Sequence, residues 1–113
     1  MRQQEKETDI QRSILDYLKL KGYRCFWRQN NLPAVYVDRH GARQFRSLPA
    51  YARRGLPDIM LIHPKDGRFY GIEVKRTTGR QSDEQKAFQR DVEAANGVYI
   101  LARSVDDVIA ARL

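Results

Sequence analysis

Apolar residues recur every four positions near the N-terminus, a spacing typical of an amphipathic helix. The stripe consists of Ile10, Ile14 and Leu18. We therefore predict a helix over residues 8–20 that ends at Gly22. Thr8 or Asp9 is expected to cap its N-terminus, because short polar side chains accept hydrogen bonds from the first free amides of a helix.

Helical spacing returns twice in the second half of the chain. Ser82 and Gln85 form a capping-box pattern that predicts a helix running to about Ala95. Its apolar face would consist of Phe88, Val92 and Ala95. Ser104 is expected to cap a last short helix, whose inward side chains would be Val105, Ile109 and Leu113.

Between these helices, aromatic and branched apolar runs predict strands. The strands are expected at residues 23–29, 58–63, 68–75 and 98–102, with a weaker hairpin formed by 34–38 and 42–48. The turn at 64–67 contains Gly67 and joins two of the strands as an antiparallel hairpin. The strand–helix–strand run that follows predicts an α/β fold with a mixed β-sheet flanked by helices, as one domain over residues 1–113.

The composition restricts the class of protein. With 42% hydrophobic and 31% charged residues, the chain is too apolar for a disordered protein and too charged for a membrane protein. No apolar run reaches the roughly 18–20 residues that span a bilayer, and the first residues lack the apolar stretch of a signal peptide. The single cysteine, Cys25, excludes an intrachain disulfide, so a reducing cytoplasmic location is expected. We expect Cys25 to be a small buried residue in its strand.

Positive charge is concentrated in one third of the chain. The whole protein has a net charge of +7, whereas residues 19–54 carry nine basic residues and one acid. Arginine is the more frequent basic residue and pairs well with phosphate oxygens. One explanation is a solvated surface, and the other is a surface that binds a polyanion such as nucleic acid.

Acidic residues mark the predicted central hairpin. Glu73 lies inside an apolar strand, and residues two apart on a strand share a face, so Glu73 and Lys75 should point the same way. Asp58 begins the partner strand and would lie near the same end of the sheet. Two carboxylates that close repel each other, and a divalent cation such as Mg²⁺ would relieve the repulsion. A surface Glu–Lys pair is the simpler alternative for Glu73 and Lys75 alone.

These residues resemble the Pro-Asp…(Asp/Glu)-x-Lys signature of the PD-(D/E)XK nuclease superfamily, here Pro57-Asp58 and Glu73-Val74-Lys75. The chain further resembles the VRR-NUC branch of that superfamily. The resemblance extends to an N-terminal helix with Glu7, to Gly55 before the Pro-Asp pair, to Ser82-Asp83-Glu84-Gln85, and to Gly97-Val98-Tyr99. It implies a restriction-endonuclease-like mixed sheet and covers nearly the whole chain.

The resemblance also implies roles for individual residues. Asp58, Glu73 and the backbone carbonyl of Val74 would bind Mg²⁺ or Mn²⁺, and Lys75 would orient or deprotonate the attacking water. Glu7 would complete the metal shell directly or through water, although an acid near a helix N-terminus is also favourable without metal; Glu5 is its rival. Gln85 would line the site or serve only the capping box. Candidate DNA contacts are Arg28, Arg43, Arg46, Arg53 and Arg54. Trp27 and Tyr51 are candidates for stacking on bases, although core packing is the expected role of Trp27.

The resulting hypothesis is a metal-dependent, structure-selective endodeoxyribonuclease of DNA repair. Small stand-alone nucleases of this type resemble resolvases of four-way (Holliday) junctions, which act as homodimers. Branched or distorted DNA and a second copy of the chain are therefore the expected partners, with no membrane. The alternatives are a flap or single-strand nuclease, a restriction-like subunit, and a DNA-binding module without catalysis.

Overall fold

The computed structural model describes residues 6–29, 35–45 and 47–113. The central sheet has four strands in the order β1-β4-β5-β6. Their bounds are β1 Phe26–Arg28, β4 Ile59–Ile62, β5 Phe69–Val74 and β6 Val98–Ala102. Strand β4 is antiparallel to both β1 and β5, whereas β6 is parallel to β5, so the sheet is mixed as the sequence predicted.

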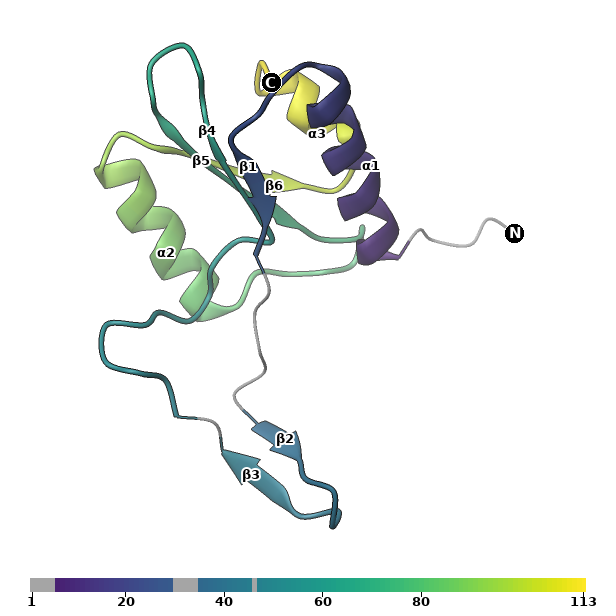
Figure 1. The fold of residues 1–113 in the computed structure, drawn as a ribbon, viewed down its shortest axis with the longest axis vertical. Helices are drawn as coiled ribbons and strands as arrows, with labels where there is room; N and C mark the ends of the chain where they lie inside the picture. The colour runs from purple at the N-terminus through teal and green to yellow at the C-terminus, as the bar shows by residue number, and fades with distance from the viewer. Residues whose placement is uncertain (1–5, 30–34, 46) are drawn as a thin grey trace.

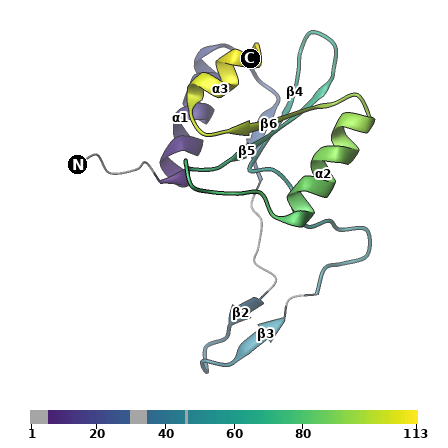
Figure 2. The same cartoon turned by 180° about the vertical axis from the view of Figure 1, so that it is seen from behind.

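Helices cover both faces of this sheet. Helices α1 (Glu7–Leu20) and α3 (Val105–Ala110) pack together on one face, and α2 (Asp83–Ala94) lies on the other (Figures 1 and 2). Helix α2 is the crossover between the parallel strands β5 and β6, the connection that a parallel pair requires. The α/β architecture predicted from the sequence is therefore confirmed.

The hydrophobic core lies between the sheet and helices α1 and α3. The predicted stripe of Ile10, Ile14 and Leu18 is buried there, with exposed fractions of 3% or less. Alternate strand residues complete the same cluster: Ile59, Leu61, Ile72, Val74, Ile100 and Ala102. Because successive side chains of a strand point to opposite faces, the intervening residues point toward α2. An edge-to-face contact between Phe69 of β5 and Phe88 of α2 fits this arrangement.

A second, two-stranded sheet projects from the body. Strands β2 (Val35–Val37) and β3 (Arg43–Phe45) pair with each other in an antiparallel hairpin, which we call the arm (residues 35–45). Figures 1 and 2 show it extending away from the central sheet. The Asp38 carboxylate orders its turn by accepting hydrogen bonds from the amides of His40 and Ala42, both at 2.9 Å. These bonds lower the pKa of Asp38, the bond from Ala42 most. The expected hairpin thus forms, with shorter strands than predicted.

Several local predictions need correction. Helix α1 begins at Glu7 after an N-cap at Lys6, so Thr8 and Asp9 lie within its first turn and neither is the cap. The acids Glu7 and Asp9 favour this start because they face the positive end of the helix dipole. Ser104 occupies the N-cap position of α3, but its side chain makes no capping hydrogen bond.

Three side chains are more exposed than the sequence predicted. Cys25 is exposed and lies one residue before β1, an edge strand of the sheet. Trp27 is 42% exposed on this edge strand, so core packing does not account for it. In α3, Ile109 is 49% exposed, and Val108 takes the buried place beside Leu113. Among the described residues, no helix is long and apolar enough to cross a membrane.

Candidate active site

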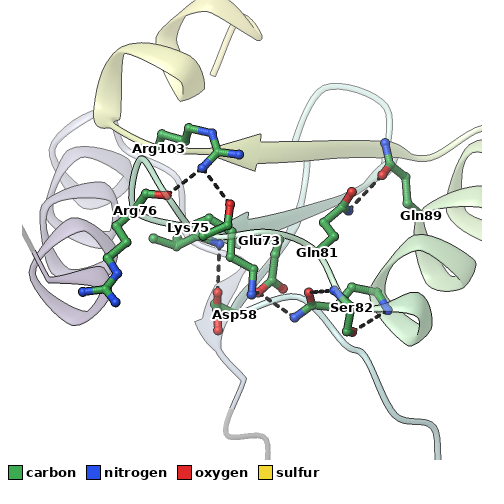
Figure 3. A network of polar contacts seen from close by, with 11 residues as sticks. Asp58, Glu73, Lys75, Arg76, Gln81, Ser82, Gln89 and Arg103 are labelled. Carbon is green, nitrogen blue, oxygen red and sulfur yellow. Dashed lines mark hydrogen bonds and ion pairs between the residues drawn. The ribbon is translucent and has the colours of Figure 1, made fainter.

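The antiparallel register of β4 and β5 brings the two predicted carboxylates together. Ile59 pairs with Ile72, so the preceding residue Asp58 lies across from Glu73. The Asp58 Oδ2 atom accepts a hydrogen bond of 2.8 Å from the amide of Val74 (Figure 3). Asp58 is thereby fixed at the end of β4, on the sheet face that α2 covers.

Glu73 is a buried carboxyl group with an unsatisfied oxygen. Its side chain is 2% exposed, and its Oε2 atom is buried without a hydrogen-bond partner among the described residues. Burial, with the negative charge of Asp58 as the second cause, raises the pKa of Glu73 to about 9. Without a cation, this carboxyl group therefore favours its protonated form at neutral pH.

Two side chains reach the other oxygen of Glu73. The ammonium nitrogen of Lys75 lies 3.8 Å from Glu73 Oε1, so the two residues share a face as predicted. The amide nitrogen of Gln85 donates to the same Oε1 atom at 3.0 Å. Lys75 and Gln85 thus hold one edge of the carboxylate and leave Oε2 free.

Gln85 serves the helix and the site together. The side-chain Oε1 atom of Gln85 accepts a hydrogen bond of 2.8 Å from the backbone amide of Ser82. The backbone amide of Gln85 donates to the Ser82 hydroxyl at 3.1 Å. This is the predicted capping box. The sequence offered capping and site lining as alternatives for Gln85, and the structure combines them.

Glu7 approaches the site from the opposite side of the sheet end. A Cβ atom built on Gly79 would lie 3.1 Å from Glu7 Oε1 and 3.3 Å from the Cβ of Lys75. The absence of a side chain at Gly79 therefore lets α1 and the lysine approach each other. The negative charge of Glu7 also contributes to the raised pKa of Glu73. The rival candidate, Glu5, lies outside the described residues.

The site contains residues that the sequence analysis did not single out. The Tyr99 hydroxyl is buried without a hydrogen-bond partner in the described part of the chain. Burial raises its pKa to about 12, with a contribution from the charges of Glu73 and Asp58. The alternation of side chains along β6 was the signal that could have identified Tyr99. Tyr99 pairs with Gly71, and Gly71 lies two residues before Glu73 on the same face of the sheet. Gln81 also lines this region and donates to Gln89 at 2.9 Å.

The predicted DNA contacts are spread over several elements. Arg28 is exposed on β1, and the next residue, Gln29, donates its amide to the carbonyl of Asp58 at 2.7 Å. Arg43 is exposed on the arm, far from this cluster along the chain. Arg53 forms an ion pair with Asp91 and lies over the ring of Phe88. Arg54 and Tyr51 are exposed, and Arg46 lies outside the described residues.

The donor set at this site fits a hard cation better than a soft one. The described residues contain no cluster of three or more His, Cys, Asp or Glu side chains able to hold a metal. Two adjacent carboxyl groups are nevertheless sufficient protein ligands for Mg²⁺, which keeps several waters and takes further oxygens from substrate phosphates. The partnerless Oε2 of Glu73 beside Asp58 is the observation that fits such an ion.

The fold and the site define a class: an α/β domain with a nuclease-like acidic centre and an adjacent lysine at the ends of neighbouring strands. The family model of the VRR-NUC domain matches residues 5–106, so the chain belongs to this nuclease-like family. No curated protein and no solved structure matches the chain.

Proposed function

We propose that the protein is a metal-dependent endonuclease that hydrolyses phosphodiester bonds in structurally distorted DNA. The observation that carries this proposal is the pair of Asp58 and Glu73, with a buried carboxylate oxygen that lacks a donor and a lysine 3.8 Å from the other oxygen. A purely structural ion pair has no use for the second carboxylate. A metal-dependent phosphodiester hydrolase uses such carboxylates to hold the cation that stabilises charge on the phosphate.

In this proposal Asp58 and Glu73 bind Mg²⁺ or Mn²⁺, together with the backbone carbonyl of Val74. Glu7 contributes through a water molecule, consistent with its position across Gly79 rather than within a cluster of three acids. When bound, the ion supplies charge that stabilises the developing negative charge on the phosphate. Oxygen ligands in this number suit these ions and disfavour thiolate-seeking metals.

Lys75 and Gln85 have different roles in this proposal. The Lys75 side chain lies on the same face as the carboxylates, where its ammonium group would orient the water that attacks phosphorus, or its neutral amine would accept a proton from that water. Gln85 is a positioning residue that holds Glu73 Oε1 by a hydrogen bond from a rigid helix start. The carboxylate is therefore oriented before substrate arrives, which lowers the cost of reaching the productive geometry.

The substrate we propose is branched DNA, such as a four-way junction, cut by a homodimer. Arg28 lies next to the strand end that carries Asp58, and Arg43 extends the basic surface along the arm; Arg46, Arg53 and Arg54 are further candidates. Basic residues on a projecting arm suit a substrate that departs from a straight duplex. Two copies would place two cutting sites on two strands.

A cleavage assay tests this proposal. Four-way junction, flap, single-stranded and linear duplex DNA would be incubated with wild type in Mg²⁺, Mn²⁺ or EDTA. We expect paired symmetric cuts in the junction, none in EDTA, and a loss of at least about a hundredfold in Glu73→Ala, within the range for removal of a group that stabilises a transition state. Glu93→Ala removes an exposed acid from α2 and is the matched control, expected to cut normally.

The other outcomes identify the alternatives. Cuts confined to flaps or single strands would keep the metal site and replace the junction. Binding of DNA without any cutting would favour a binding module or a subunit that needs a partner. Asp58→Ala distinguishes a nuclease from a binder, because in a nuclease it abolishes cutting while DNA binding is kept or strengthened.

A further inference from the structure

A second polar pocket lies beside the candidate active site. It has a volume of about 650 Å³ and is formed by the loop after β5, the first turns of α2 and the end of β6. Three of its lining residues are cationic: Arg80, Lys86 and Arg103. Thr77 and Thr78 add hydroxyl groups, and none of the lining residues is acidic. The pocket is therefore suited to an anion.

Arg103 stabilises the loop that forms the pocket, whereas Arg80 and Lys86 are available to contact a ligand. Arg103 donates from Nη1 to the carbonyl oxygens of Arg76 at 2.6 Å, Gly79 at 3.0 Å and Thr77 at 3.2 Å. These bonds hold the loop in a defined shape (Figure 3). The side chains of Arg80 and Lys86 make no ion pair or hydrogen bond with any residue that the structure describes.

The pocket and the active site share a wall. The loop leads directly from Lys75 to α2, and Gly79 in the pocket lining approaches the Cβ of Lys75. Leu101, also in the lining, pairs with Glu73 across β5 and β6. In Figure 3, Gln81 and Arg103 flank Glu73 and Lys75. A nucleic-acid strand that places one phosphate at Glu73 therefore runs close to this pocket.

We infer that this pocket binds a phosphate group of the nucleic-acid strand in the active site, next to the phosphodiester that is cut. The inference rests on the proposed function and adds a subsite that fixes the strand's position. Arginine and lysine side chains and hydroxyl groups are common partners of phosphate oxygens in protein–DNA complexes. Such contacts position the strand and carry no base preference.

The binding test uses conditions in which nothing is cut. Affinity for a labelled DNA substrate would be measured by fluorescence anisotropy in EDTA over a range of salt concentrations. Arg80→Ala combined with Lys86→Ala is the test variant. Lys19→Ala combined with Lys65→Ala is the control, since it removes the same charge from exposed positions on α1 and on the β4–β5 turn. Circular dichroism would establish that both variants fold.

We expect the pocket variant to bind about tenfold more weakly and the control to bind nearly as wild type. Each lost phosphate contact should reduce the slope of log affinity against log salt by about 0.9 on duplex DNA. Equal losses in the two double variants would overturn the inference. A 5′-phosphorylated and a 5′-hydroxyl substrate distinguish a terminal from an internal phosphate. The inference expects wild type and the pocket variant each to bind the two substrates equally. A preference of wild type for the 5′-phosphate that the pocket variant loses would assign the pocket to a terminal phosphate and overturn the inference.

A small probe locates the site without reference to cleavage. Thymidine 3′,5′-bisphosphate would be titrated into isotope-labelled protein in EDTA and followed by amide chemical shifts. We expect shifts at Thr78, Gly79 and Arg80 that disappear in the pocket variant and persist in the control. Shifts confined to other surfaces would overturn the inference. A protein that shows these shifts but cuts no DNA would refute the proposed nuclease and retain the phosphate site.

Discussion

Glu73 is the residue of the candidate site whose surroundings differ most from those of an ordinary carboxylate. It is buried, faces a second carboxyl group, and is contacted on a single oxygen by Lys75 and Gln85. The lysine lowers the pKa of Glu73, but burial and Asp58 outweigh it. In the absence of a cation, the folded state therefore holds an acid that prefers to remain protonated.

Replacing Glu73 by glutamine should stabilise the protein at alkaline pH when metal is absent. The pKa of Glu73 is about 9 in the folded chain against an ordinary value of 4.5, so unfolding releases a proton between these values. Wild type then loses stability as pH rises through this window, and Glu73→Gln does not. Thermal melts in EDTA should show the variant several degrees more stable at pH 8, since about 1 kcal/mol shifts the melting temperature of such a domain by roughly 4–8 °C.

The difference in melting temperature between wild type and Glu73→Gln should disappear toward and below pH 4.5, where the Glu73 carboxyl group becomes protonated in the unfolded state as well as in the folded state. Mg²⁺ at pH 8 should raise the melting temperature of wild type and leave Glu73→Gln little changed. The same gap at every pH would show that glutamine acts through packing and not through the lost charge.

Short-range spacing in the sequence was enough to predict the central residues of the site. Asp58, Glu73 and Lys75 follow from strand alternation and one tight hairpin. Tyr99 and Arg103 did not, because their approach depends on the parallel pairing of β5 and β6 across a whole helix. The same limit applies to the pairing of Arg53 with Asp91, which joins residues far apart in the chain.

At the scale of elements, the first turn of α2 both starts the helix and contacts the candidate active site. The capping box orders Ser82 and Gln85, and the same glutamine contacts Glu73. Gly55 allows this turn to sit close to the preceding loop, since a Cβ atom there would lie 2.5 Å from the backbone carbon of Glu84. The position of the helix start therefore determines where the carboxylate points.

Changing Gln85 to glutamate separates the two roles. Glutamate is a normal partner in a capping box, so α2 should remain intact. Its carboxylate cannot donate to Glu73 Oε1 and adds a further negative charge to the site. We expect Gln85→Glu to keep a near-native circular dichroism spectrum and melting temperature at acidic pH, and to lose about tenfold or more in DNA cleavage at neutral pH.

Gln85→Leu provides the comparison, because it removes the side-chain bond of Gln85 to the Ser82 amide as well as the donor to Glu73, while the Ser82 cap itself remains. It should lose activity together with about 1 kcal/mol of stability, the usual net value of one hydrogen bond. Activity in Gln85→Glu equal to that of wild type would mean that the hydrogen bond to Glu73 has no part in catalysis.

Helices with a clear stripe and a clear stop were the elements best predicted from the sequence. The burial of Ile10, Ile14 and Leu18 and the capping box of α2 match the prediction. The last helix, α3, also forms where it was predicted, but Ile109 is exposed and Val108 is buried in its place, since a six-residue helix offers too few turns to fix its apolar face. The N-cap of α1 also escaped prediction, because Lys6 has no capping side chain and helix start is set by the surrounding chain.

At the scale of the molecule, a body with the acidic site carries a projecting basic arm. The arm's strands pair with each other and belong to a sheet of their own. Arg39 and Arg43 are exposed there, and Asp38 is engaged in the turn. Under the proposed function, the arm would contact DNA away from the bond that is cut.

Removing these two arginines should weaken DNA binding and leave the body unaffected. We expect Arg39→Ala with Arg43→Ala to raise the KM for DNA about tenfold at low salt, with kcat nearly unchanged. The melting temperature should stay within about 2–3 °C of wild type, because exposed substitutions rarely change stability by more than about 0.5 kcal/mol. Steady-state kinetics at two salt concentrations would test this, with the Lys19 and Lys65 double variant as the charge-matched control. A fall in kcat alone would assign the arm to the chemical step.

The attachment of the arm makes the molecule modular. The chain leaves the central sheet after β1 and returns at β4, and these strands are neighbours with Arg28 paired to Ile59. Gln29 and Asp58, at the two ends of the excursion, are themselves hydrogen-bonded. The intervening segment can therefore be shortened, lengthened or exchanged without altering the pairing of the sheet. Under the proposed function, the same catalytic domain would act on different DNA shapes when a different segment is inserted between β1 and β4.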